Sequence, residues 1–101
     1  MKLDFEWNSA KERLNQHYHD VSFAEASTVF GDPQAATAYD AAHSTANEDR
    51  YITMGLSSDN RLLIVVHCDR GEKIRIITAR QATSRESDQY EKGKWAGRDE
   101  T

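Results

Sequence analysis

Two apolar segments separated by a glycine-containing turn constrain the fold of this chain more than any other sequence feature. Residues Arg61–Cys68 form the most apolar stretch, and Glu72–Ala79 follows directly after the turn. Short segments rich in β-branched residues are typical of strands. Asp69-Arg70-Gly71 suits a three-residue hairpin loop with glycine in the left-handed position. The sequence therefore predicts an antiparallel hairpin over residues 61–79.

The rest of the chain predicts three further strands and three helices. Asn8 is a good N-cap for a helix over Ser9–His19, and Ser22 and Thr83 each open a capping box that starts another helix. The expected strands are residues 3–7, 34–39, 50–56, 61–68 and 72–79. The predicted order is β-α-α-β-β-β-β-α, an α+β domain with an antiparallel sheet and helices packed on one face.

The length and composition fit one small domain. With 101 residues, of which 38% are hydrophobic, we expect a single domain over residues 1–93 and a flexible C-terminal tail over 94–101. The longest apolar run, Leu62–Val66, is far shorter than a membrane span of about 20 residues. The N-terminus has no apolar signal segment, and the single Cys68 cannot form an internal disulfide. These features predict a cytoplasmic protein without a membrane partner.

The hairpin register decides which side chains share a face. A three-residue loop pairs His67 with Lys73 and Val65 with Arg75. One face, expected to be the core under the helices, then carries Leu62, Ile64, Val66, Cys68, Ile74 and Ile76. The other face, expected to carry the chemistry, holds Arg61, Leu63, Val65, His67, Lys73, Arg75 and Ile77. Cys68 is accordingly predicted to be an inert buried hydrophobe.

Positive charge is concentrated in one part of an acidic chain. The formal net charge is -4, yet residues 61–85 carry six basic groups and two acidic ones. A local excess of cations can bind an anion regardless of the net charge. The alternative is that these arginines lie on solvated strand edges, as charged residues often do.

A second pattern lies on the first predicted helix. Trp7, Lys11, Asn15 and His19 are spaced by four residues and so form one stripe, beside an apolar line of Ala10, Leu14 and Tyr18 that we expect to face the core. An indole, an ammonium, an amide and an imidazole in a row indicate a binding surface. The alternative is that Trp7 belongs to the core and the other three simply face solvent.

Three blocks of the sequence resemble the BrnT family of bacterial toxins. The blocks are Trp7-Asn8-x-x-Lys11-x-x-x-Asn15 with His19-x-Val21-Ser22-Phe23-x-Glu25-Ala26, then Asp40-x-x-His43-Ser44 with Glu48-x-Arg50 and Gly55, and finally Arg75-Ile76-Ile77-Thr78-Ala79-Arg80-x-Ala82-Thr83-x-x-Glu86-x-x-x-Tyr90. The similarity runs from about residue 4 to Gly93, in order and at matching spacings.

The resemblance implies a RelE-like toxin of a type II toxin–antitoxin system. Such a toxin is an endoribonuclease that cleaves RNA without a metal or other cofactor and so stops translation and growth. The implied partner is a BrnA-like antitoxin with a ribbon-helix-helix part, and the complex would repress its own operon through operator DNA. The sequence departs from the family at Tyr18 and Asp20, where lysine and glycine are usual. An aspartate at a left-handed helix end costs about 1 kcal/mol relative to glycine.

Metal-free RNA cleavage needs a phosphate clamp and groups that transfer protons. Arg75 and Arg80 are the first candidates for the clamp, because guanidinium binds phosphate oxygens bidentately. His19, His67 and Lys11 are the candidates for proton transfer, and histidine titrates closest to neutrality. The other residues expected to contact RNA are Trp7, Asn15, Arg61, Lys73, Arg85 and Tyr90.

Several alternatives stay open at this point. Tyr90 could equally anchor the last helix in the core, and the capping box by itself accounts for Glu25. His17 and His19 diverge on a helix and have no third ligand at suitable spacing, so no metal site is expected. A chain with weakened catalysis could instead act as a binding module that works with its antitoxin in repression.

Overall fold

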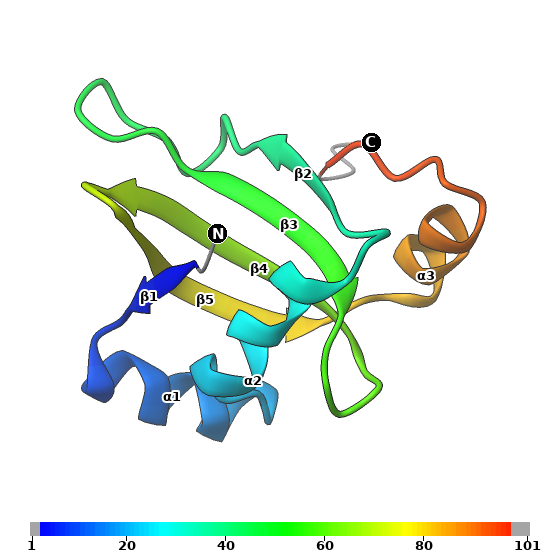
Figure 1. The fold of residues 1–101 in the computed structure, drawn as a ribbon, viewed down its shortest axis with the longest axis horizontal. Coiled ribbons are helices and arrows are strands. Elements are labelled where there is room, and N and C mark those ends of the chain that lie inside the picture. Colours follow the sequence, from blue (N-terminus) through cyan, green and yellow to red (C-terminus); the bar gives the residue numbers. More distant parts are fainter. Residues whose placement is uncertain (1–2, 98–101) are drawn as a thin grey trace.

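The computed structural model describes residues 3–97 and has the predicted order of elements (Figure 1). The strands are β1 (Asp4–Glu6), β2 (Ala36–Tyr39), β3 (Tyr51–Leu56), β4 (Leu62–Arg70) and β5 (Lys73–Gln81). The helices are α1 (Ser9–His19), α2 (Phe23–Ser27), a 3₁₀ turn η1 (Thr28–Gly31) and α3 (Ser84–Glu91). The α+β prediction is confirmed. Among the described residues, no helix is long and apolar enough to cross a membrane.

The five strands form one mixed sheet in the order β1-β5-β4-β3-β2. β1 is parallel to β5, with Asp4 opposite Lys73 and Glu6 opposite Arg75, whereas the other pairs are antiparallel. The prediction of an antiparallel sheet is therefore wrong for this edge. Apolar alternation identifies a strand but not its neighbour, because the neighbour is chosen by tertiary packing.

The predicted hairpin forms, but in a different register. Its loop has two residues, Gly71 and Glu72, so that Arg70 pairs with Lys73 and Cys68 with Arg75. Gly71 has φ +63°, the left-handed conformation that tight hairpin turns require. An irregularity between Val66 and His67 then shifts the pairing further. The predicted register is wrong, and Arg75 lies on the same face as Cys68.

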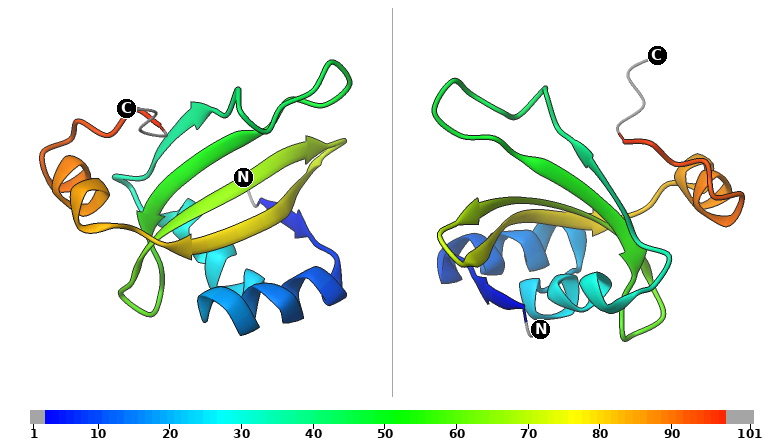
Figure 2. Two further views of the ribbon diagram at one scale, coloured as in Figure 1. Left: turned by 180° about the vertical axis from the view of Figure 1, so that it is seen from behind. Right: turned by 45° about the horizontal axis from the view of Figure 1, so that its top comes forward.

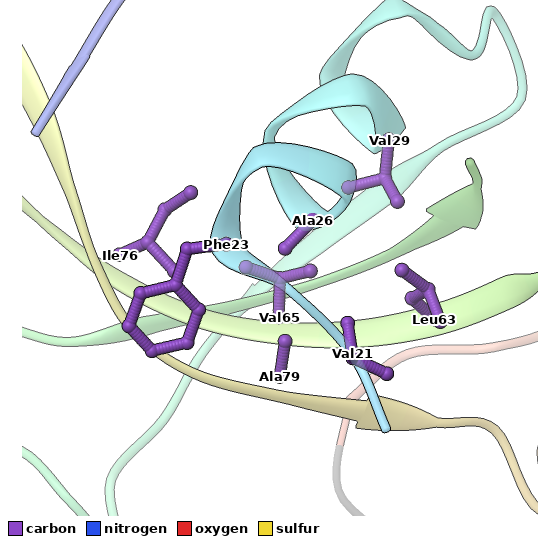
Figure 3. Packing of buried hydrophobic residues seen from close by; sticks show 8 residues of the cluster. All are labelled: Val21, Phe23, Ala26, Val29, Leu63, Val65, Ile76 and Ala79. Atoms are coloured by element: carbon purple, nitrogen blue, oxygen red, sulfur yellow. The ribbon is translucent and has the colours of Figure 1, made fainter. Parts of the chain in front are cut away.

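Both faces of the sheet are buried. Leu63 and Val65 of β4 pack with Phe23 and Ala26 of α2, as Figure 3 shows. Their neighbours on the opposite face, Ile64 and Val66, belong to a second cluster described below. The prediction that only one face is apolar core, with Leu63, Val65 and His67 on an open chemical face, is therefore wrong. A strand buried on both sides has no alternation that could reveal its orientation.

The second cluster is covered by the C-terminal part of the chain. Trp95 is 6% exposed and packs with Ile52, Met54, Ile64 and Val66. Tyr90 of α3 packs against the same cluster, although α3 lies apart from α1 and α2 (Figure 2). The helices thus do not all cover one face. Residues 94–97, expected to belong to a flexible tail, include a core side chain, while 98–101 lie outside the described residues.

α1 lies beside β5 and is docked through an amide, not through an apolar stripe. Asn15 is buried, and its Nδ2 donates to the carbonyls of Val21 and Ala79 at 2.9 and 2.8 Å. Its Oδ1 accepts from the backbone N–H of Ala79 and the hydroxyl of Thr78 at 3.1 and 3.0 Å. Asn15 therefore pairs with Ala79 as a neighbouring strand would. The expectation that Leu14 and Tyr18 face the core is wrong, since both are exposed.

The helix ends follow local sequence signals. Asn8 caps α1, and Asp20 ends it in the left-handed conformation with φ +57°. Ser22 caps α2, but the carboxylate of Glu12 on α1 accepts from the N–H of Phe23 at 2.9 Å. The full capping box predicted for α3 is present. These caps confirm the predicted helix starts because capping depends only on nearby residues.

Candidate phosphate-binding groove

Four cationic side chains from separate parts of the chain line one pocket of about 230 Å³. We call it the cationic pocket. Lys11 comes from α1, Arg50 precedes β3, Arg70 ends β4, and Arg75 lies on β5. The rest of the lining is Asn8, Glu48, Ile76 and Ile77. The sheet geometry brings these residues together because the hairpin of β4 and β5 folds beside the loop before β3 and the start of α1.

Two of the four cations already have carboxylate partners. Arg75 Nη1 lies 2.6 Å from Glu6 Oε2, and Arg50 Nε lies 2.8 Å from Glu48 Oε1. Within the described part of the chain, Lys11 and Arg70 are in no ion pair. The pocket therefore keeps an excess of positive charge, which suits a bound anion.

Glu48 is the only carboxylate in the lining of the cationic pocket. The hydrogen bond from Arg50 lowers its pKa below the ordinary value for glutamate. Its side chain is therefore an ionised acceptor at neutral pH, held in place by Arg50. A fixed carboxylate beside several cations can accept a proton from a bound hydroxyl group.

A second pocket of about 240 Å³ continues from the first along α1. It is lined by Lys11, Leu14, Asn15, Tyr18, His19, Ile77 and Thr78. Lys11 and Ile77 belong to both pockets, so the two form one groove between α1 and β5. His19 lies at the other end of this groove, eight residues and about 12 Å of helix from Lys11. The structure thus brings Lys11, His19 and Arg75 to one surface.

A third pocket of about 430 Å³ adjoins the cationic pocket through Glu48 and Arg70. Its other lining residues are Asn47, Asp49, Tyr51 and Asp69. Three carboxylates against one guanidinium disfavour a phosphate there. No three His, Cys, Asp or Glu side chains within residues 3–97 are grouped in a way that could hold a metal ion.

Arg80 does not join Arg75. Its guanidinium donates to both carboxylate oxygens of Glu86, at 2.8 and 3.0 Å. Glu86 is buried, and the pair, mainly through the hydrogen bonds from Arg80, lowers the pKa of Glu86. Arg80 also lies five residues along β5 from Arg75, about 16 Å of strand. Its observed role is to hold α3 against the sheet.

His67 lies in the core and not in the groove. It is 6% exposed, and its Nε2 lies 2.7 Å from Thr53 Oγ1, with Phe30 and Tyr51 packed around the ring. Burial lowers the pKa of His67 to about 4. The imidazole is therefore neutral at physiological pH and shielded from a bound substrate.

His67 is expected to make the fold sensitive to acid. The unfolded chain binds a proton at His67 below a pKa of 6.5, whereas the folded chain does so only near 4. Between these values stability falls as the pH falls, by about 2 kcal/mol at pH 5 from this residue. Urea unfolding at about pH 7 and pH 5 should show a smaller loss for His67→Gln than for the parent. An equal loss in both proteins would contradict the assignment.

Three other residues expected to bind RNA have internal partners. Trp7 packs edge-on against Phe23, with ring centroids 6.3 Å apart. Arg61 binds Glu25 through two hydrogen bonds, the one from Nε being 2.9 Å long. Tyr90 donates to Asp32 at 2.5 Å, and burial together with this bond raises the pKa of Tyr90 to about 12. These positions support the core alternative for Trp7 and Tyr90.

Two further candidates lie on the surface and away from the groove lining. Lys73 follows the hairpin turn opposite Arg70, and Arg85 lies in the first turn of α3. Cys68 is fully buried beneath the cationic pocket, and burial raises the pKa of its thiol. The prediction of a buried Cys68 is confirmed.

Sequence reasoning missed three residues of the cationic pocket: Glu48, Arg50 and Arg70. Glu48 and Arg50 belong to the loop block of the family resemblance, so the signal was present without a role attached to it. Arg70 was assigned to a three-residue turn, although it ends β4. The correct hairpin register would have placed Arg70 beside Lys73 and on the face of Arg75.

Comparisons with known proteins agree with this site. A search of curated proteins found no match. Among solved structures, the ribonuclease toxin BrnT of Brucella abortus is 17% identical, with a TM-score of 0.62, over 82% of this chain and 100% of that chain. This likeness shows a shared fold, and the expected likeness to RelE stays a prediction. The family model described as the ribonuclease toxin BrnT of type II toxin–antitoxin systems matches residues 7–86. The chain therefore belongs to the BrnT family of ribonuclease toxins.

Proposed function

We propose that this chain is a metal-independent endoribonuclease that cleaves RNA in the cationic pocket by attack of a ribose 2′-hydroxyl on the adjacent phosphate. The observation that carries the proposal is the position of Lys11 and Arg70, two cations without ion-pair partners in the described chain, beside Arg75 in one pocket. Because guanidinium and ammonium groups neutralise phosphate oxygens, this arrangement suits a transferring phosphate.

The reaction forms one bond and breaks another. The 2′-oxygen loses its proton to a base and attacks phosphorus, and the bond from phosphorus to the 5′-oxygen breaks. The 5′-oxygen then takes up a proton. The products are a 2′,3′-cyclic phosphate and a 5′-hydroxyl end, so the step needs no water and no oxidant. The extra negative charge on the five-coordinate phosphate is stabilised by Arg70 and Arg75.

Glu48 and Lys11 are the groups of the pocket that can move these protons. Glu48 is ionised and held by Arg50, so it can accept the 2′-proton. Lys11 carries protons and lies in the lining, so it can supply one to the 5′-oxygen. We assign His19, at the far end of the groove, to binding the neighbouring nucleotide.

The test is digestion of a single-stranded RNA by the purified toxin, with and without EDTA. We expect equal rates in both, because none of the proposed steps uses a metal. Treatment of the fragments should reveal 2′,3′-cyclic phosphate or the 3′-phosphate that forms from it, together with 5′-hydroxyl ends. Loss of cleavage in EDTA, or 5′-phosphate ends, would show that a different mechanism operates.

The family assignment supports an antitoxin partner. We infer a ribbon-helix-helix antitoxin of the BrnA type, bound to the toxin in the cytoplasm and carrying the complex to operator DNA. Induced expression of the toxin alone should stop growth, and co-expression with the antitoxin should restore it. If growth continues while the chain still binds the antitoxin, the chain is a binding module for repression. The Tyr18 and Asp20 departures favour that second candidate.

A further inference from the structure

The outer face of α1 carries apolar side chains that the fold leaves uncovered. Tyr18 is 73% exposed and Leu14 is 57% exposed, although hydrophobic spacing on a helix normally marks a core face. Both side chains line the second pocket of the groove. The edge of the His17 ring contacts Tyr18 at a centroid distance of 4.9 Å. A supported, exposed phenol ring therefore forms one wall of the groove.

This wall is continuous with the cationic pocket. Lys11 and Ile77 belong to both pockets, and His19 lies beside Tyr18 in the second. An RNA whose phosphate lies between Lys11 and Arg75 must carry its next nucleotide either along α1 or away from it. Along α1 the strand meets a cation, then an aromatic ring, which is the combination that single-stranded nucleic acids favour.

We propose that Tyr18 is a stacking platform for an unpaired RNA base next to the scissile phosphate. The proposal rests on the proposed ribonuclease function and extends it to the substrate class, which is single-stranded RNA. A base in a duplex is stacked on its neighbours and cannot lie on the Tyr18 ring. Purines, with their larger faces, should be preferred at this position. Protein side chains could also cover Leu14 and Tyr18, but the shared Lys11 favours a polyanion.

The experiment measures binding of a short single-stranded RNA that cannot be cleaved because fluorine replaces its 2′-hydroxyls. Fluorescence anisotropy compares the parent protein with Tyr18→Ala and Tyr18→Phe. We expect Tyr18→Ala to bind about tenfold more weakly and Tyr18→Phe to bind as the parent does, because one stacked base contributes on the order of 1–3 kcal/mol. Tyr39→Ala is the matched control, since Tyr39 is an exposed tyrosine on β2, outside the groove lining.

Further arms separate the possible results. With an RNA that lacks bases, the difference between the parent and Tyr18→Ala should disappear. If Tyr18→Ala binds the intact RNA as tightly as the parent, the platform is overturned while the ribonuclease proposal stands. If Tyr18→Ala keeps RNA affinity but loses binding to purified antitoxin, the surface serves a protein and the platform is again overturned. If the parent neither binds nor cleaves RNA, the ribonuclease proposal itself has failed.

Discussion

Arg75→Ala is expected to slow RNA cleavage by about two to three orders of magnitude, as loss of one group that stabilises transition-state charge typically does. Arg75 lines the cationic pocket with Lys11 and Arg70, and its side chain is held by Glu6 at 2.6 Å. That position fixes the guanidinium in the pocket before substrate arrives. The variant should show a reduced kcat with a smaller change in KM, because the extra phosphate charge appears only during the reaction.

The fold should tolerate this substitution. The ion pair of Arg75 with Glu6 is about one-third exposed, so its loss should change the free energy of unfolding by less than about 1 kcal/mol. Arg13→Ala is the matched control, because it removes an exposed arginine of α1 that lies outside the groove lining. Arg80 is unsuitable for the comparison, since its removal leaves the buried carboxylate of Glu86 without its partner. Wild-type cleavage by a folded Arg75→Ala protein would exclude Arg75 from the clamp.

Trp95→Ala is expected to lower the free energy of unfolding by about 3 kcal/mol, the lower end of the range for truncating a buried tryptophan. The indole of Trp95 packs on Ile52, Met54, Ile64 and Val66, and its removal would leave a cavity on that face of the sheet. Part of the cost is offset because the buried Nε1 of Trp95 has no hydrogen-bond partner in the structure. Urea unfolding of the parent and the variant measures the difference.

Lys94→Ala is the control for that experiment. Lys94 is the exposed neighbour of Trp95, so the substitution changes the same segment without changing the core. We expect its unfolding midpoint to match that of the parent. A change of less than about 1 kcal/mol for Trp95→Ala would mean that residues 94–97 behave as the tail that the sequence predicts.

The sequence predicts the elements of this fold well because their signals are local. Asn8, Ser22 and Thr83 cap the three helices as expected, since a capping side chain bonds to a backbone N–H three residues away. Gly71 has the left-handed conformation that its place in the turn implies. The part of the groove on α1 was also recognisable, because the spacing of Lys11 and His19 places them on one side of a helix.

The sequence was a poor guide to burial on α1 and on the central hairpin. Asn15 was expected to contact RNA, whereas its amide completes the hydrogen bonding of Ala79 at the edge of the sheet. Leu14 and Tyr18 were expected in the core but lie in the groove. A polar residue that pairs with a distant backbone cannot be distinguished, by its type and spacing, from one that faces solvent.

By itself, the amino-acid sequence determined the order of the elements, the helix starts and the membership of the BrnT family, because each depends on neighbouring residues or on matching motifs. Only the tertiary structure decided the parallel pairing of β1, the hairpin register and the burial of Trp95. It also decided that Arg75 lies with Lys11 and Arg70, while Arg80 binds Glu86. These outcomes depend on contacts between residues far apart in the chain, whose energies no local pattern records.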